Sequence, residues 1–156
     1  MTRKVFFSFK YDDVHRAMNV RNSNVIGGVM KSGFIDKAEF EKVEREGNRA
    51  IQTWIDNQLN GTSVTVVLVG ANTHKSKWVK YEIDQSIARG NGLLTIDISK
   101  VADMQGITTD CCSLRVPGYK HYYWNKDDGR ANLGAWVEAA ASAAGTNWRP
   151  STAAPG

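Results

Sequence analysis

Three short runs of apolar residues stand out from an otherwise mixed sequence, and each has the pattern of a strand covered on both faces. They are VFFSF (residues 5–9), SVTVVLVG (63–70) and LLTIDI (93–98). The second run is also rich in β-branched residues, which favour strands. A fourth and weaker candidate is HYYW at residues 121–124. We expect these four segments to form strands.

Segments with the helical spacing of apolar residues lie between the runs. Residues 51–59 place isoleucine or leucine at every fourth position, and Gly61 follows as a stop signal. Residues 76–90 have the same spacing, and the Ala-rich segment 133–145 predicts a closing helix. Strands that alternate with helices of this length indicate parallel βαβ units. The expected fold is α/β and flavodoxin-like, a doubly wound parallel sheet with helices on both faces.

The chain of 156 residues has the length of one domain. We expect that domain to span residues 1–145. Residues 146–156 carry two of the three prolines and no acid, so we expect a flexible tail there. Two segments, 20–47 and 99–120, resist assignment to a helix or strand. Long irregular connections in compact domains are often functional.

The predicted helix at 76–90 carries two residues that its amphipathic pattern does not require. Val79, Ile83 and Ile87 are expected to share one buried face. Trp78 and Glu82 are also four residues apart and are expected beside that face, close to the rim of the core. By themselves they have an ordinary interpretation, a packed tryptophan with a solvated glutamate one turn later. The alternative is that the two side chains form one wall of a ligand crevice.

Polar residues follow the first three predicted strands, and ligands of open α/β sheets bind outside the carboxyl ends of the strands. The candidates at these ends are Ser8, Lys10, Tyr11, Asp12, Asp13, Asn72, Asp97 and Ser99. Asp12 and Asp13 suggest the acidic pocket of a response-regulator receiver. That interpretation needs a phosphoacceptor aspartate, and the segment VVLVGANT has no carboxylate. Helix capping is the favoured role for both acids.

Several common catalytic and binding motifs do not occur in the sequence. It has no GxGxxG, no GxxxxGK[ST] and no GxSxG, which argues against a Rossmann fingerprint, a P-loop and a serine nucleophile of the hydrolase type. His15, His74 and His121 are scattered without metal-ligand spacing, so we expect no metal site. Trp54 and Trp136 fall on helical stripes and are expected in the core.

Cysteine content and charge limit the compartment and the partners. Cys111 and Cys112 are adjacent, which does not make a disulfide framework, so a reducing cytoplasm is expected. The sequence offers no signal peptide and no run of the ~20 apolar residues that a membrane span requires. The net charge of +4 is spread along the chain. Nucleic-acid binders more often concentrate basic residues on one element, so this partner is not favoured.

Five segments, in order, resemble TIR-like proteins of bacterial anti-phage defence, notably the TIR component of Thoeris systems. They are VFFSFKYDD, VRNSNV, TSVTVVLVG, SKWVKYEIDQSIARGNG and YYWNKDDGRANLGAWV. The resemblance covers nearly the whole chain up to about Trp136. It implies a flavodoxin-like fold and an enzyme that cleaves NAD at the nicotinamide–ribose bond. NAD is then the substrate, and no cofactor is expected.

The resemblance places the catalytic glutamate at Glu82, and the chemistry agrees with that role. Departure of nicotinamide leaves positive charge on the ribose, an oxocarbenium-like state similar to that of glycosidases. A carboxylate can stabilise this charge. Nicotinamide leaves as a neutral base, so the reaction needs no strong general acid.

Other residues are expected around the substrate. The set is Ser8, Phe9, Lys10, Tyr11, Asn72, Trp78 and Asp97. Trp78 could stack on a flat ring, and Lys10 could meet the pyrophosphate. Asn72 and Asp97 are included by position at strand ends only. Residues 20–47 occupy the place of the loop that covers the site in many TIR domains.

The resulting prediction is an enzyme that makes an ADP-ribose signalling molecule, cyclic by expectation, which activates a separate effector protein. A phage-derived trigger and a homo-oligomeric state are left open. The alternative is a TIR-type interaction module without catalysis. A third reading, a nucleotide-binding flavodoxin-like domain of another class, is disfavoured by the missing phosphate loop.

Overall fold

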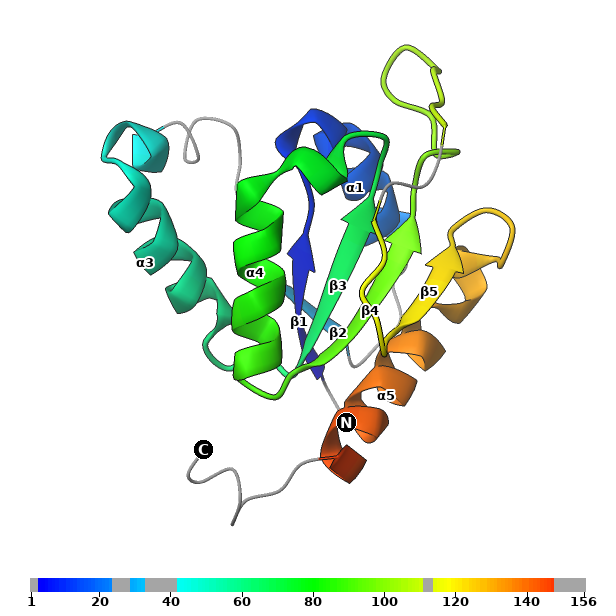
Figure 1. Ribbon diagram of the computed structural model, residues 1–156. Helices are drawn as coiled ribbons and strands as arrows, with labels where there is room; N and C mark the ends of the chain where they lie inside the picture. Colours follow the sequence, from blue (N-terminus) through cyan, green and yellow to red (C-terminus); the bar gives the residue numbers. More distant parts are fainter. Residues whose placement is uncertain (1–2, 24–28, 33–41, 111–113, 148–156) are drawn as a thin grey trace.

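The computed structural model describes residues 3–23, 29–32, 42–110 and 114–147, which contain a five-stranded sheet (Figure 1). The strands are β1 (Arg3–Ser8), β2 (Val29–Ser32), β3 (Val64–Val69), β4 (Gly92–Asp97) and β5 (Lys120–Tyr123). They are all parallel and lie in the order β2-β1-β3-β4-β5. This is the flavodoxin-like order, so the expected fold is confirmed.

The four expected strands are all present, and every residue of β3 and β4 is buried. Burial on both faces explains why their sequences are continuous apolar runs instead of alternating ones. The fifth strand, β2, lies inside the segment 20–47 and was not predicted. Its sequence is VMKS, only four residues long and half polar, because it forms an edge of the sheet.

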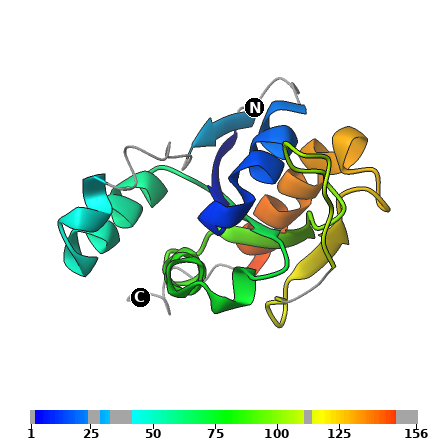
Figure 2. The same ribbon diagram turned by 90° about the horizontal axis from the view of Figure 1, so that it is seen from above.

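Helices cover both faces of the sheet. They are α1 (Val14–Ser23), α3 (Asn48–Leu59), α4 (Lys77–Ala88) and α5 (Gly129–Asn147). Seen from above, α1 and α5 lie on one side of the strands and α4 lies on the other (Figure 2). The core is divided in the same way: Val5 and Phe7 pack with α1 and α5, whereas Phe6 packs with α3.

The buried face of α4 differs from the expected one at its end. Val79 and Ile83 are buried as predicted, but Ile87 is 41% exposed, and Glu82 and Ser86 are buried instead. A strict four-residue repeat drifts around a helix of 3.6 residues per turn, so the stripe that faces the sheet moves from position 83 to 86. Glu82 therefore lies under the helix rather than at the rim.

The connection from β4 to β5 contains no helix in its described parts, residues 98–110 and 114–119. Leu114 and Val116 pack against the same face of the sheet as α4. On the other face, Arg16 donates hydrogen bonds of 2.8 Å to the carbonyl oxygens of Val101 and Ile107. These contacts explain how a long segment without secondary structure is held. Cys111 and Cys112 lie outside the described residues, as do residues 148–156 of the expected tail.

Candidate active site

A cavity of about 350 Å³ lies between α3 and α4, beyond the carboxyl end of β1. It is lined by Phe7, Phe9, Lys10, Tyr11, Asp12, Val43, Glu44, Ile51, Trp54, Ile55, Ser76, Lys77, Trp78 and Glu82. Ligand pockets in proteins begin at about this volume. The cavity lies at the edge of the sheet where a flavodoxin-like fold binds its ligands.

The start of α4 fixes the orientation of Glu82. The Ser76 side chain caps the helix by accepting a hydrogen bond of 3.2 Å from the backbone N–H of Val79. From that start, Val79, Glu82 and Ser86 share the face that packs on the sheet. The hydroxyl of Ser86 bonds back to the Glu82 carbonyl at 2.7 Å and to Thr65 of β3 at 2.6 Å. The helix turn that carries Glu82 is therefore tied to the middle of the sheet.

Glu82 is a buried carboxyl that accepts a hydrogen bond from Ser8. It is 9% exposed, and the Ser8 hydroxyl at the end of β1 donates a hydrogen bond of 2.5 Å to its Oε1. Burial raises the pKa of Glu82 to about 8, although the hydrogen bond from Ser8 opposes the rise. Within the described residues no Lys or Arg forms an ion pair with it. Burial without such an ion pair therefore favours the protonated form of Glu82.

Two tryptophans lie on the walls of the cavity. Trp78 of α4 is half-buried and meets Tyr81 edge to face, with ring centroids 6.1 Å apart. Trp54 of α3 was expected in the core, but it is only partly buried and lines the cavity as well. Helical spacing identifies the face of each helix, but it does not show which two helices will enclose a space. This is why the sequence did not indicate Trp54.

The two helices that form the walls are joined at some distance from the cavity mouth. Tyr81 of α4 donates its hydroxyl to the carboxylate of Asp56 on α3, at 3.0 and 3.2 Å. Arg89, just after α4, donates to the carbonyl oxygen of Asp56 at 3.0 Å. Burial, and the hydrogen bond that Tyr81 donates to Asp56, raise the pKa of the Tyr81 hydroxyl. Toward the start of the helices the separation between α3 and α4 increases (Figures 1 and 2).

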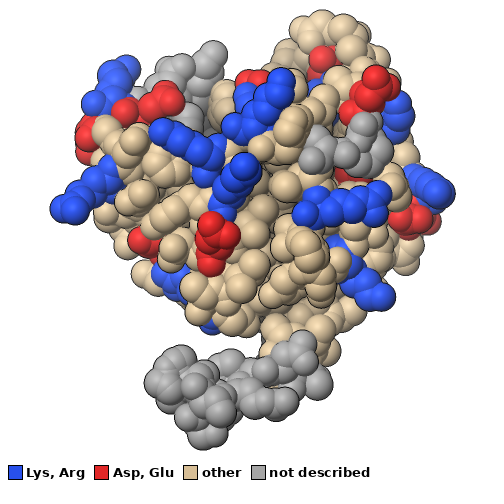
Figure 3. All heavy atoms as spheres, viewed as in Figure 1, with Lys and Arg blue, Asp and Glu red and all other residues tan. Residues whose placement is uncertain are grey.

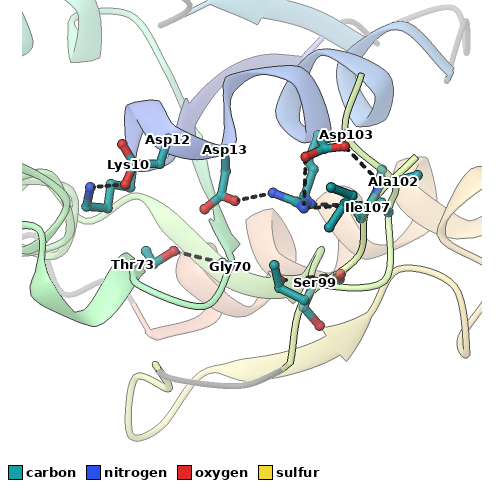
Figure 4. Close-up of polar contacts among 12 residues, drawn as sticks. Lys10, Asp12, Asp13, Gly70, Thr73, Ser99, Ala102, Asp103 and Ile107 are labelled. Carbon is teal, nitrogen blue, oxygen red and sulfur yellow. Dashed lines mark hydrogen bonds and ion pairs between the residues drawn. The ribbon is translucent and has the colours of Figure 1, made fainter. Parts of the chain in front are cut away.

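The charged residues at the cavity are of both signs. Lys10 and Lys77 line it together with Asp12 and Glu44. Lys10 pairs with Asp12 at 2.5 Å, in the loop after β1 (Figure 4). Over the whole face of the molecule shown in Figure 3, basic and acidic side chains are interspersed. This distribution agrees with the sequence-based argument against a nucleic-acid partner.

Asp12 and Asp13 occupy a 3-10 turn (Tyr11–Asp13) before α1, and each pairs with a cation. Asp13 is buried and bonds to Arg16 at 3.0 Å. Burial raises the pKa of the Asp13 carboxyl, and Arg16 opposes the rise. A Cβ at Gly70 would lie 2.2 Å from an Asp13 oxygen, so the turn after β3 needs glycine to pass this carboxylate (Figure 4). The ion pair with Arg16 ties Asp13 into the fold, and the expected capping role of the two acids stays a prediction.

The structure does not gather all of the predicted substrate-binding residues at the cavity. Phe9, Lys10, Tyr11 and Trp78 line it, and Ser8 lies just behind as the partner of Glu82. Asn72 is exposed in the turn after β3, and Asp97 is buried with its carboxylate accepting two hydrogen bonds of 2.7 Å from Ser99. Neither lines the cavity, so a substrate role for these two stays a prediction.

Half of the segment expected to cover the site lies outside the described residues. Of the segment 20–47, positions 24–28 and 33–41 are not described. Val43 and Glu44 are the members of this segment that line the cavity within the described part of the chain.

The described part of the chain has neither a cluster of metal ligands nor a helix that could span a membrane. It contains no group of three or more His, Cys, Asp or Glu side chains placed to hold a metal ion. Across the same residues, no helix combines the length and apolar character needed to cross a bilayer.

Comparison with known proteins identifies the family of this chain. Residues 6–103 match the family described as "Thoeris protein ThsB, TIR-like domain". The chain belongs to this family. The matched range includes the end of β1, α3 and α4, and every residue that lines the cavity. A protein of Bacillus cereus (strain MSX-D12), named "Putative cyclic ADP-D-ribose synthase ThsB1", is 33% identical over an alignment of 145 residues, which covers 88% of this chain and 72% of the relative. The resemblance noted in the sequence is confirmed.

Proposed function

We propose that this protein cleaves NAD at the bond between nicotinamide and ribose and closes the remaining ADP-ribose into a ring. One observation carries the proposal: the chain of a Thoeris TIR-like protein places a buried carboxyl, Glu82, in a cavity at the ligand-binding edge of its sheet. The name of the Bacillus cereus relative supports the choice of NAD as substrate and of a cyclic product.

In the proposed reaction, the bond from ribose C1′ to the nicotinamide nitrogen breaks and its electron pair leaves with nicotinamide. The positive charge passes from the nicotinamide ring to the ribose. The carboxylate of Glu82 stabilises that charge inside a cavity with little water to screen it. A nucleophilic atom of the ADP half then attacks C1′. A net proton is released as nicotinamide and the cyclic product form.

Glu82 must lose its proton for this role, and binding of the substrate favours that loss. The nicotinamide ring of NAD is positively charged, and a positive charge close to a carboxyl favours its ionised form. Binding of NAD is therefore expected to lower the pKa of Glu82 from about 8. Trp78 and Trp54 offer flat apolar surfaces for an aromatic ring of the substrate.

The product is proposed to act as a signal to a separate effector protein, after a phage-derived trigger. A diffusible product would connect the two proteins without a permanent complex. Cyclisation requires that water be kept from C1′ while the ring closes. The walls from α3 and α4 already enclose the region around Glu82 on two sides.

The test is incubation of the purified protein with NAD, with and without an extract of phage-infected cells. Chromatography measures nicotinamide, and mass spectrometry separates linear ADP-ribose from a cyclic product, which is lighter by one water. We expect nicotinamide and the cyclic species. Nicotinamide with only linear ADP-ribose would reject the cyclase and leave an NAD hydrolase. No nicotinamide under either condition would favour a non-catalytic interaction module.

A further inference from the structure

A dinucleotide substrate has a diphosphate that the cavity must also accommodate, and Lys10 was the residue expected to meet it. The structure weakens that assignment. The ammonium of Lys10 lies 2.5 Å from a carboxylate oxygen of Asp12. A cation that is already paired offers little net charge to an incoming phosphate, unless the existing ion pair is broken.

Lys77 is the other cation that lines the cavity, and its surroundings are different. Its Nζ lies 4.9 Å from the centroid of the Trp78 ring and 3.5 Å from the side-chain oxygen of Asn48. Both neighbours are uncharged. Among the described residues no carboxylate lies within ion-pair distance of this ammonium. Its charge is therefore available to a ligand at the mouth of the cavity.

The position of Lys77 in α4 also favours binding of an anion. It is the first residue of the helix, and the first turn contains no acid. Cations are disfavoured at a helix amino terminus, because the unpaired N–H groups there already make the potential positive. A bound anion would offset both sources of positive charge.

The spacing between Lys77 and Glu82 fits the two chemical groups of one nucleotide. They are five positions apart on α4, a rise of ~7.5 Å along the helix axis, and both line the cavity. In NAD, the ribose and its 5′ carbon separate the reacting C1′ atom from the diphosphate by a comparable span. With C1′ at Glu82, the diphosphate can extend along α4 toward its first turn, past Trp78.

From these observations we infer that Lys77, and not Lys10, binds the diphosphate of the substrate. The inference rests on the proposed function, since it takes NAD as the ligand of the cavity. It assigns the first turn of α4 to binding of the diphosphate, and the next turn, which carries Glu82, to the reacting bond.

The experiment compares Lys77→Gln with Lys80→Gln, which changes an exposed lysine on the same helix that does not line the cavity. Binding of NAD and of nicotinamide riboside, which has no phosphate, is measured by calorimetry at two salt concentrations. We expect Lys77→Gln to weaken NAD binding about tenfold, to leave riboside binding unchanged and to reduce the salt dependence. Lys80→Gln should match the unmodified protein.

The outcomes separate this inference from the proposed function. If the unmodified protein binds NAD and releases nicotinamide, but Lys77→Gln and Lys80→Gln bind NAD equally well, the inference is wrong and the proposed function stands. An equal loss of affinity for NAD and for the riboside would also overturn it, because the effect would then not depend on phosphate. If the unmodified protein neither binds nor cleaves NAD, both are rejected.

Discussion

Two hollows of different size lie in the described part of the chain, and the smaller one is the candidate active site. The larger, of about 650 Å³, lies at the amino ends of β4 and β5 between the end of α4 and the alanine-rich face of α5. Among the described residues, its charged lining residues are Arg89 and Lys120, and none of its lining residues is an acid. The smaller cavity has half the volume, but it contains a buried carboxyl whose pKa is raised to about 8.

Strand direction explains the difference. Because all strands are parallel, their carboxyl ends and the amino termini of the following helices meet at one edge of the sheet. Loops at that edge present Lys10, Tyr11 and Ser76 to the same space. At the opposite edge, the turn through Gly90 enters β4 directly, and the face of α5 that lines the hollow is mostly alanine. A perturbed buried acid is a better sign of a site than volume is.

Removing the charge of Glu82 should give the largest effect. Glu82→Gln keeps the size and the hydrogen-bonding shape but cannot stabilise the oxocarbenium-like state. We expect the rate of nicotinamide release to fall by roughly a hundred- to a thousandfold, the usual cost of losing an aligned electrostatic contact. Asp84→Asn changes an exposed acid of the same helix that does not line the cavity, so it is the matched control and should retain the activity. Equal turnover of Glu82→Gln and the unmodified protein would show that the active site does not lie in this cavity.

Stability should depend on pH through Glu82. Its pKa rises from the ordinary 4.5 to about 8 on folding, so between these values the folded state binds more protons than the unfolded state. The free energy of unfolding contributed by this group is therefore fully present below pH 4.5 and is lost as the pH rises toward 8, by a few kcal/mol. Thermal unfolding from pH 5 to 8 should show this decline in the unmodified protein, with a shallower decline in Glu82→Gln. Parallel curves for the two proteins would mean that Glu82 ionises normally.

The two hollows also contain comparable tryptophans. Trp78→Phe removes part of the aromatic surface beside Glu82, and NAD binding should weaken by ~0.5–1.5 kcal/mol, the range for aromatic contacts. Trp136 lines the larger hollow and stacks on Tyr122 at 4.1 Å, so Trp136→Phe should reduce thermal stability slightly without changing NAD affinity. Calorimetry measures the NAD affinity of both variants, and thermal unfolding measures their stability. Unaltered NAD affinity in Trp78→Phe would make that residue a packing residue only.

The smallest effect is expected from narrowing the larger hollow. Ala143 is exposed on α5 and lines it, so Ala143→Leu adds bulk there without entering the core. We expect turnover of NAD to be unchanged and the free energy of unfolding to change by less than ~0.5 kcal/mol. A clear loss of turnover would show that the two hollows are not independent.

Much of the fold could be predicted because buried segments have a recognisable apolar pattern in the sequence. Completely buried strands such as β3 and β4 must be apolar throughout, whereas the edge strand β2 is short and half polar, so it left no comparable pattern. The connection after β4 was also unassigned, because it is held by Arg16 and by scattered apolar contacts that have no period.

The site was predicted less completely than the fold. Glu82 was identified by family resemblance, but its burial was not expected, because a four-residue repeat placed it at the rim of the core. The pairing with Ser8 joins residues 74 positions apart, and no local pattern encodes such a contact. Trp54 was assigned to the core because helical spacing shows only which face of its helix it lies on. Its place on the wall of the cavity depends on where α4 lies in space.

The two walls of the cavity are anchored separately. The turn of α4 that carries Glu82 is fixed to the central strands by the hydrogen bond of Ser86 and by buried apolar contacts. On the other side, α3 packs its buried apolar face on Phe6 of β1, and the Asp56 contacts join it to α4. Because each wall has its own attachment to the sheet, a substitution that loosens one helix is expected to leave the other wall in place.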